Sequence, residues 1–152
     1  MGSFLFVCTA FAPKNVIGSV RPTKIAKYLV RAGHDVTVVM PELPPDEPRD
    51  SLLMTPEMER VRVISVPYGK TYHRIRGRYR QGAGREAGAG SSGGASPLKQ
   101  LARFVYGLYS EACWARRARK LLVKNLPVRP FDAVFSTYPN LGTHWVAAQA
   151  RR

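Results

Sequence analysis

A strand–helix–strand pattern in the first 41 residues constrains the fold most strongly. Residues 4–9 (FLFVCT) form an uncharged apolar run, which is typical of a strand buried on both faces. Residues 21–32 repeat apolar side chains at helical spacing, with Ser19 as the expected cap and Gly33 at the end. Residues 35–40 (DVTVVM) predict a second buried strand. Together these elements predict a βαβ unit.

The pattern continues along the chain. Residues 61–67 and 132–137 predict a third and a fourth strand, and residues 97–125 and 142–152 predict two more helices. On the longer helix, apolar side chains share one expected face: Leu101, Val105, Leu108 and Ala112, joined by Phe104 and Trp114. We therefore expect an α/β fold over residues 1–152, a Rossmann-like doubly wound parallel sheet that is incomplete at about four strands.

Two phosphate-binding sequence patterns do not match this chain. A dinucleotide-binding turn needs GxGxxG after the first strand and an acidic residue at the end of the second strand. Here the turn holds one glycine, Gly18, and the second strand ends in Met40 and Pro41. A phosphate loop of the form GxxxxGK[ST] does not occur in the sequence.

The charge of the chain predicts an anionic partner. It carries 24 Lys and Arg against 10 Asp and Glu, a formal net charge of +14. This charge favours membrane lipids, nucleic acid or phosphorylated substrates without choosing among them. The two cysteines, Cys8 and Cys113, show no disulfide or metal spacing, so we expect two buried thiols in a reducing cytosol. No apolar run reaches the roughly 18 residues of a membrane span.

The middle of the chain is strongly basic and then nearly free of large side chains. Arginines and tyrosines alternate over residues 68–80, and residues 82–96 are almost all Gly, Ala and Ser, which predicts a flexible loop inside the domain. The long helix ends in a second basic run. We expect membrane or anion contacts from Arg74, Arg76, Arg78, Arg80, Arg116 and Arg117.

Candidate ligand contacts follow three strands, at residues 12–19, 68–80 and 136–144, because ligands of open α/β sheets bind beyond the carboxyl ends of the strands. Gly18 and Ser19 open the first helix, and a glycine there lets the backbone approach a phosphate or sugar, or simply makes a turn. The remaining candidates are Arg21 and Lys24 for phosphates, Ser136, Thr137, Tyr138 and Asn140 for sugar hydroxyls, and His144 as a catalytic base.

Each of these candidates also has a purely structural explanation. Arg21 and Lys24 fit a solvated helix face, and residues 136–140 fit a strand-to-helix turn with its cap. A single helical histidine such as His144 is more often structural, and we assign His34 to packing. The sequence shows no clustered metal ligands, no carboxylate pair for hydrolysis, and no Ser/His/Asp set.

Two segments resemble retaining GT-B glycosyltransferases of family 4. The first segment, FVCTAFAPKNVIGSVRPTKIAKYLVRAGHDVTVVMP, is similar to the opening of these enzymes, with its Gly33-His34 pair followed by Val36, Val38 and Pro41. The second segment, FDAVFSTYPNLGTHWVAAQ, resembles their "DVxxSTxPxxxxHxxA" stretch. The resemblance covers most of the chain outside residues 70–100 and keeps the order of the two segments.

The resemblance implies transfer of a sugar from a nucleotide-sugar to an acceptor, free or lipid-linked, in cell-envelope glycan synthesis. It implies no metal and no cofactor, and it places the glycine that corresponds to Gly18 near the donor diphosphate. Relatives hold the donor mainly in a second, C-terminal domain with an "ExxxxxE" motif, which does not occur here. We therefore expect the acceptor-side part of such an enzyme, inactive alone, cytoplasmic, and peripheral on the inner face of the plasma membrane.

A second class of function stays open. The chain could be a non-catalytic basic module that binds an anionic membrane or nucleic acid, because the interleaved Arg and Tyr of residues 68–80 suit phosphates and bases. No named nucleic-acid-binding motif accompanies them, which makes nucleic acid the less favoured partner.

Overall fold

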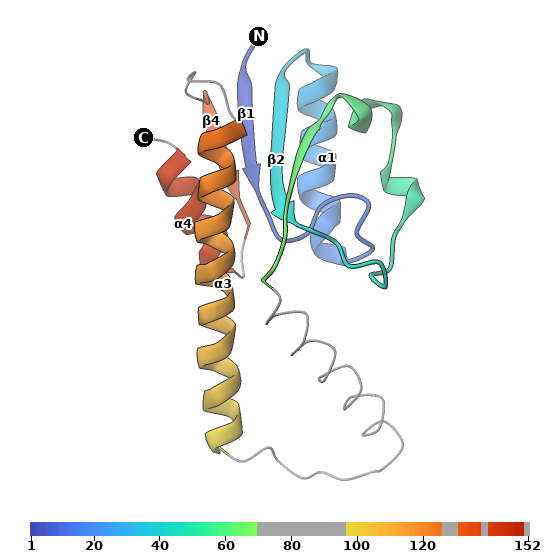
Figure 1. The fold of residues 1–152 in the computed structure, drawn as a ribbon. Coiled ribbons are helices and arrows are strands. Elements are labelled where there is room, and N and C mark those ends of the chain that lie inside the picture. The colour runs from blue at the N-terminus through green and yellow to red at the C-terminus, as the bar shows by residue number, and fades with distance from the viewer. Residues whose placement is uncertain (70–96, 126–130, 138–139, 151–152) are drawn as a thin grey trace.

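The computed structural model describes residues 1–69, 97–125, 131–137 and 140–150 (Figure 1). The predicted flexible loop at 82–96, the basic residues Arg74, Arg76, Arg78 and Arg80, and Tyr138 lie outside these ranges. The elements are β1 (Ser3–Val7), α1 (Ile17–Arg31), β2 (Asp35–Pro41), the 3₁₀ helices η1 (Ser51–Leu53) and η2 (Pro56–Arg60), β3 (Arg62–Val66), α3 (Pro97–Asn125), β4 (Ala133–Ser136) and α4 (Leu141–Ala150).

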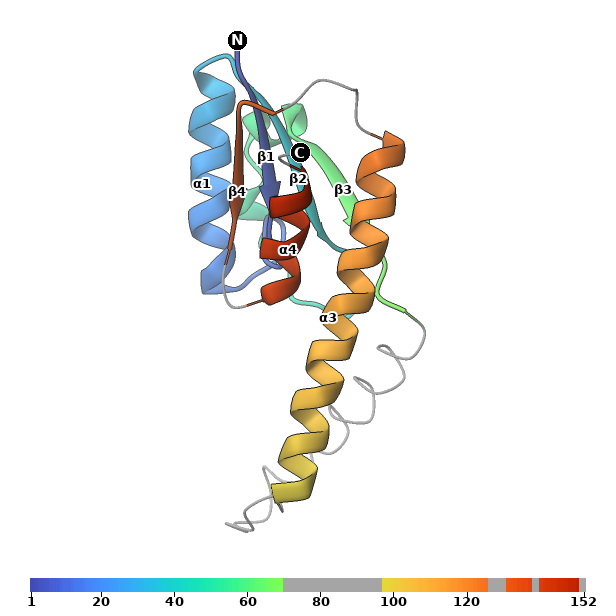
Figure 2. The ribbon, with the colours of Figure 1, turned by 90° about the vertical axis from the view of Figure 1, so that its left-hand side faces the viewer.

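The four strands form one parallel sheet in the order β3-β2-β1-β4. In its register, Phe6 of β1 lies between Val38 of β2 and Phe135 of β4. Helices cover both faces of this sheet, α1 on one and α3 with α4 on the other (Figures 1 and 2). The prediction of a Rossmann-like, doubly wound parallel sheet of about four strands is confirmed.

The two central strands are buried on both faces because their side chains alternate between two cores. Phe6 and Val38 point to the α1 side, where they join Val30 in one apolar cluster. Leu5, Val7 and Val39 point to the other side, where they meet α3 and α4. The residues that α3 and α4 contribute to this second cluster include Trp114, Ala115, Ala118, Leu122, Val146 and Ala147.

Helix α1 begins one turn earlier than predicted. Its N-cap is Val16, not Ser19, and no side chain caps the first turn. Ser19 is fully buried inside the helix, where its hydroxyl lies 2.7 Å from the Lys14 carbonyl oxygen and 2.6 Å from that of Val16. The serine therefore fastens the preceding loop to the helix instead of opening it. The helix end is as predicted, with Gly33 in the left-handed region at φ 82°.

The bounds of α3 are as predicted, but Trp114 does not share the face of Leu101, Val105 and Leu108. Leu101, Val105 and Leu108 are all exposed, and so is Phe104. The buried side chains belong to the second half of the helix and include Trp114 and Leu122. The first half of α3 extends past the carboxyl edge of the sheet, so the sheet offers it no surface to pack against (Figures 1 and 2).

One smaller expectation also changed, because Cys8 is buried as predicted but Cys113 is partly exposed. The loop between β2 and β3 contains η1 and η2. An ion pair of 2.6 Å between Glu57 of η2 and Arg31 ties this loop to α1.

Two helical glycines should respond oppositely to alanine. A Cβ at Gly142 of α4 would lie 3.1 Å from the backbone oxygen of Glu111 in α3, whereas a Cβ at Gly107 of α3 would meet nothing within 4 Å. We expect Gly142→Ala to lower the free energy of unfolding by about 1–3 kcal/mol through overpacking. Gly107→Ala should raise it by about 0.5–1 kcal/mol, because alanine favours the helix. Urea unfolding of both variants tests this, and equal effects would contradict the close α3–α4 contact.

Candidate functional site

The candidate site lies where the direction of the chain across the sheet reverses. From β1 the chain proceeds to β2 and β3 on one side, and then returns to place β4 on the other side of β1. Such a reversal opens a crevice beyond the carboxyl ends of the two strands. Val7 and Ser136 are paired at these ends, and the Thr137 N–H donates to the Val7 carbonyl oxygen at 3.3 Å. The segment after β4 is therefore fixed beside the segment after β1.

A hydroxyl–imidazole pair occupies this edge. Ser136 Oγ lies 2.7 Å from Nδ1 of His144, and both side chains are half-buried. When Ser136 donates to Nδ1, the other ring nitrogen carries the proton and can donate to a ligand. In the opposite tautomer Nε2 is free to accept a proton. The two predicted residues are brought together, although no sequence pattern indicates that they bind each other.

Thr143, which the sequence analysis did not single out, fixes the turn between β4 and α4. Its side chain is fully buried, and its Oγ1 lies 2.8 Å from the Thr137 carbonyl oxygen and 2.7 Å from that of Asn140. The Thr143 N–H also donates to the Asn140 carbonyl oxygen at 3.2 Å. These bonds hold the half-buried Asn140 at the start of α4. They also fix the position of His144, which directly follows Thr143.

The start of α1 is open to solvent near the end of β1. Gly18 is exposed, and a Cβ there would approach only the Ala10 Cβ, at 3.8 Å. Arg21 and Lys24 are also exposed, but they lie in the second turn and beyond, since α1 begins at Ile17. Ser19 is not available to contact a ligand, because its hydroxyl is buried and its amide already donates to the Val16 carbonyl oxygen at 2.9 Å.

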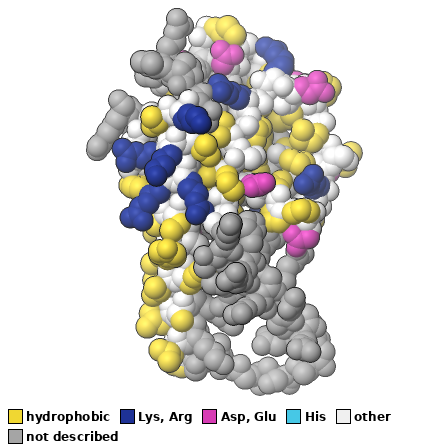
Figure 3. Space-filling model, viewed as in Figure 1, with side chains coloured by type: hydrophobic (Ala, Val, Ile, Leu, Met, Phe, Trp, Pro, Cys, Tyr) yellow, Lys and Arg dark blue, Asp and Glu magenta, His cyan; other side chains and the backbone are white. Residues whose placement is uncertain are grey.

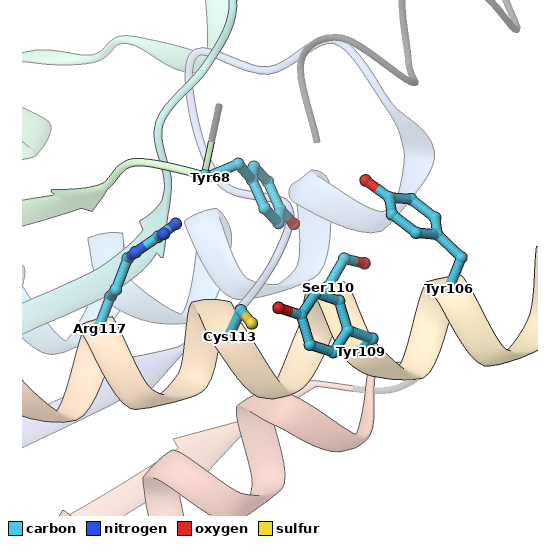
Figure 4. Close-up of a pocket in the computed structure, with 7 residues that line it drawn as sticks. Tyr68, Tyr106, Tyr109, Ser110, Cys113 and Arg117 are labelled. Carbon is cyan, nitrogen blue, oxygen red and sulfur yellow. The ribbon is translucent and has the colours of Figure 1, made fainter. Parts of the chain in front are cut away.

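A small pocket follows β3, between the end of that strand and the middle of α3 (Figure 4). Its volume is about 60 Å³. Tyr68 reaches toward α3 from the strand side, and Tyr106 and Tyr109 rise from the helix. The full lining, called the tyrosine pocket below, comprises Tyr68, Gly69, Tyr106, Tyr109, Ser110, Cys113 and Arg117.

The electrostatics of the tyrosine pocket combine the cation of Arg117 with the phenol of Tyr109. The Arg117 guanidinium packs against Gly69, where a Cβ would lie 2.8 Å from either terminal nitrogen, so a side chain at position 69 would displace it. The hydrogen bond with the Cys113 side chain, followed by the charge of that group, raises the pKa of Tyr109 above its ordinary value. Tyr109 therefore keeps its proton at neutral pH and can donate to a ligand oxygen.

The tyrosine pocket offers flat aromatic surfaces, hydroxyls and one guanidinium. This set suits a ligand with several hydroxyls and a negative charge. Ligand contacts after β3 are expected from the sequence, but, apart from Arg117, the α3 residues that complete the pocket were not among the predicted site residues. Their signal was the three- and four-residue spacing of Tyr106, Ser110, Cys113 and Arg117, which puts them on one side of a helix. In the described parts of the chain, no three His, Cys, Asp or Glu side chains are grouped to hold a metal ion.

The two thiols should differ sharply in reactivity. Cys8 is fully buried, and burial raises its pKa to about 12, so almost no reactive thiolate forms at pH 8. Cys113 is partly exposed in the tyrosine pocket. We expect a disulfide reagent to modify one thiol per native chain rapidly, and the second only on unfolding. The variant Cys113→Ser should lose the rapid phase, and a rapid phase that survives this change would contradict the burial of Cys8.

Comparison with known proteins does not assign the chain to a family. Family models, curated proteins and solved structures yield no match to the chain. The function is therefore argued from the paired Ser136 and His144, the open start of α1 and the tyrosine pocket. All three lie at segments that follow the carboxyl ends of parallel strands.

Proposed function

We propose that the chain is the acceptor-binding, N-terminal part of a retaining GT-B glycosyltransferase. The observation that carries the proposal is the Ser136–His144 pair, held at 2.7 Å beside the end of β1 at the point where the strand order reverses. This is where an open α/β sheet binds its ligand. The resemblance of residues 4–41 and 131–149 to family 4 transferases supports the same reading.

The side chains at this edge suit an acceptor that carries sugar hydroxyls. Asn140 supplies an amide donor and acceptor, and Ser136 and Thr137 supply hydroxyls. In the tautomer in which Nδ1–H donates to Ser136 Oγ, the Nε2 atom of His144 would hold the acceptor hydroxyl and accept its proton. The acceptor oxygen then bonds to the anomeric carbon of the donor sugar as the bond from that carbon to the diphosphate breaks.

The cations near this edge suit phosphate groups. Arg21 and Lys24 are exposed on α1, and Arg117 lines the tyrosine pocket. In this proposal they meet the phosphate of a lipid-linked acceptor or of the donor. The nucleotide-sugar itself is held mainly by a separate donor domain, so residues 1–152 alone transfer no sugar. The proposed location is the inner face of the plasma membrane.

The second candidate is a basic module that binds an anionic surface without catalysis. The observation in its favour is the set of exposed cations on the second half of α3: Arg116, Arg117, Arg119, Lys120 and Lys124. It needs no role for His144 or for the tyrosine pocket, which allows a direct test.

Amide chemical-shift mapping on the isotope-labelled chain separates the two candidates. We expect methyl glycosides to shift the amides of residues 136–144 and 68–69 with dissociation constants on the order of 1 mM, a value typical of weak sugar contacts. The double variant Ser136→Ala/His144→Ala should abolish the shifts at 136–144, because the sugar hydroxyls lose both partners. Ser51→Ala, an exposed serine on η1, is the matched control and should bind as the unchanged chain does.

The same experiment tests nucleotide-sugars, the ligands that should bind only weakly. UDP- and GDP-sugars should bind the chain weakly, and coupled assays should detect no transfer. Tight binding of a nucleotide-sugar at the carboxyl edge would show that the donor site has been misplaced. No response to any glycoside, together with binding to polyanions, would favour the non-catalytic module.

A further inference from the structure

One continuous side of α3 faces away from the rest of the molecule. Its residues follow one another at three- and four-residue intervals, which places them on a single face of the helix. None of its members belongs to the second core. This side, called the outward face below, comprises Leu98, Leu101, Val105, Leu108, Ala112, Arg116, Arg119 and Lys120.

The outward face is apolar in its first half. The exposed fractions run from 40% for Leu108 to 76% for Leu98, with Leu101 and Val105 between them. Phe104, 64% exposed, borders the same half. Soluble surfaces tolerate single exposed apolar residues, but a contiguous row of this length marks an interaction site. Figure 3 shows these side chains as a yellow strip along the protruding part of α3.

The outward face is cationic in its second half. Arg116, Arg119 and Lys120 are exposed one to two turns after the apolar row, and Figure 3 shows a blue cluster directly beyond the yellow strip. The one acidic residue of α3, Glu111, is half-buried on another side, where its Oε2 accepts from the Gly142 N–H at 3.4 Å. Nothing on the outward face therefore neutralises its cations.

We propose that the outward face of α3 lies on the surface of an anionic lipid bilayer. The apolar half inserts among the upper acyl chains, and the cationic half rests on the anionic headgroups. An amphipathic helix that lies in the membrane interface needs this combination of apolar burial and electrostatic attraction. Arginine and lysine side chains can reach the headgroups while their stems stay in apolar contact. No helix of the described residues is both long enough and apolar enough to span a bilayer, so the contact is interfacial.

The charge pattern favours a lipid surface over a second copy of the chain. Two parallel α3 helices joined by their outward faces would bring the cations of both copies together, with no acidic residue between them. An anionic bilayer offers the opposite charge and an apolar interior at the same time. The inference does not depend on glycosyl transfer, because it uses neither the Ser136–His144 pair nor the tyrosine pocket.

Vesicle co-sedimentation tests the proposal with the whole chain. We expect binding to vesicles of phosphatidylcholine and phosphatidylglycerol, and little binding to phosphatidylcholine alone. Leu101→Gln/Leu108→Gln and Arg116→Gln/Arg119→Gln/Lys120→Gln should each lower the partition coefficient by about tenfold or more. All five positions are exposed, so circular dichroism should show an unchanged fold.

Matched variants on the opposite side of the sheet control for total hydrophobicity and charge. Leu52→Gln/Met54→Gln removes two exposed apolar side chains, and Arg31→Gln/Arg49→Gln/Arg60→Gln removes three exposed cations. These sites lie on α1 or in the 42–60 segment that packs on the α1 side. Both controls should bind vesicles nearly as the unchanged chain does.

A fluorescence measurement distinguishes insertion from adsorption. Val105→Trp in a Trp145→Phe background leaves the buried Trp114 as the other indole. Lipids brominated on their acyl chains should quench the new fluorophore. Unchanged binding in both α3 variants, or no quenching at position 105, would overturn the proposal. Lipid-independent dimerisation abolished by Leu101→Gln/Leu108→Gln would also overturn it, and so would binding of single-stranded RNA in preference to vesicles at the same salt concentration.

Discussion

The fold depends on the burial of β1 and β2 from both sides. Both strands have runs of apolar side chains with almost no solvent contact, so each face of the sheet needs its own cover. Each large apolar side chain that is fully buried, such as Phe6 or Val38, contributes roughly 1.5–3 kcal/mol relative to its exposed state. α1 supplies the cover on one face and α3 with α4 supplies it on the other, which requires the chain to cross the sheet between β3 and β4. Because of this crossing, β4 lies beside β1 and the ends of the two strands are neighbours.

The candidate site is a consequence of this arrangement. Ser136 and His144 meet because β4 pairs with β1 and because Thr143 holds the turn that leads into α4. The tyrosine pocket forms because α3 runs alongside the end of β3. Its cation, Arg117, packs against Gly69, where a side chain would displace the guanidinium. In both places the backbone geometry of the fold positions the polar groups.

The sequence predicted the buried half of the structure better than the exposed half. The strands were recognisable because two-sided burial demands continuous apolar runs, and the bounds of α3 followed from Pro97 and from the prolines after Asn125. The start of α1 was misjudged because Ser19 resembles a cap in the sequence while its hydroxyl actually bonds backward to Lys14 and Val16. Trp114 was wrongly assigned to the apolar face of α3, and the exposure of the rest of this face was not foreseen, because helical periodicity reveals that a face exists but not what covers it. The Ser136–His144 contact depends on the geometry of a tight turn, which periodicity does not encode.

Two sides of α3, the outward face and the side that lines the tyrosine pocket, are offset by one residue in the sequence. Tyr106, Cys113 and Arg117 directly follow Val105, Ala112 and Arg116 of the outward face, so this side of the tyrosine pocket is turned from that face by about 100° around the helix axis. α3 is one unbroken helix of 29 residues, so this angle is built in rigidly. If the outward face rests flat on a bilayer, the pocket opens sideways, nearly parallel to the membrane plane. A ligand would then enter by sliding along the headgroup layer, with its lipid tail left in the membrane and only its polar end turned toward the protein.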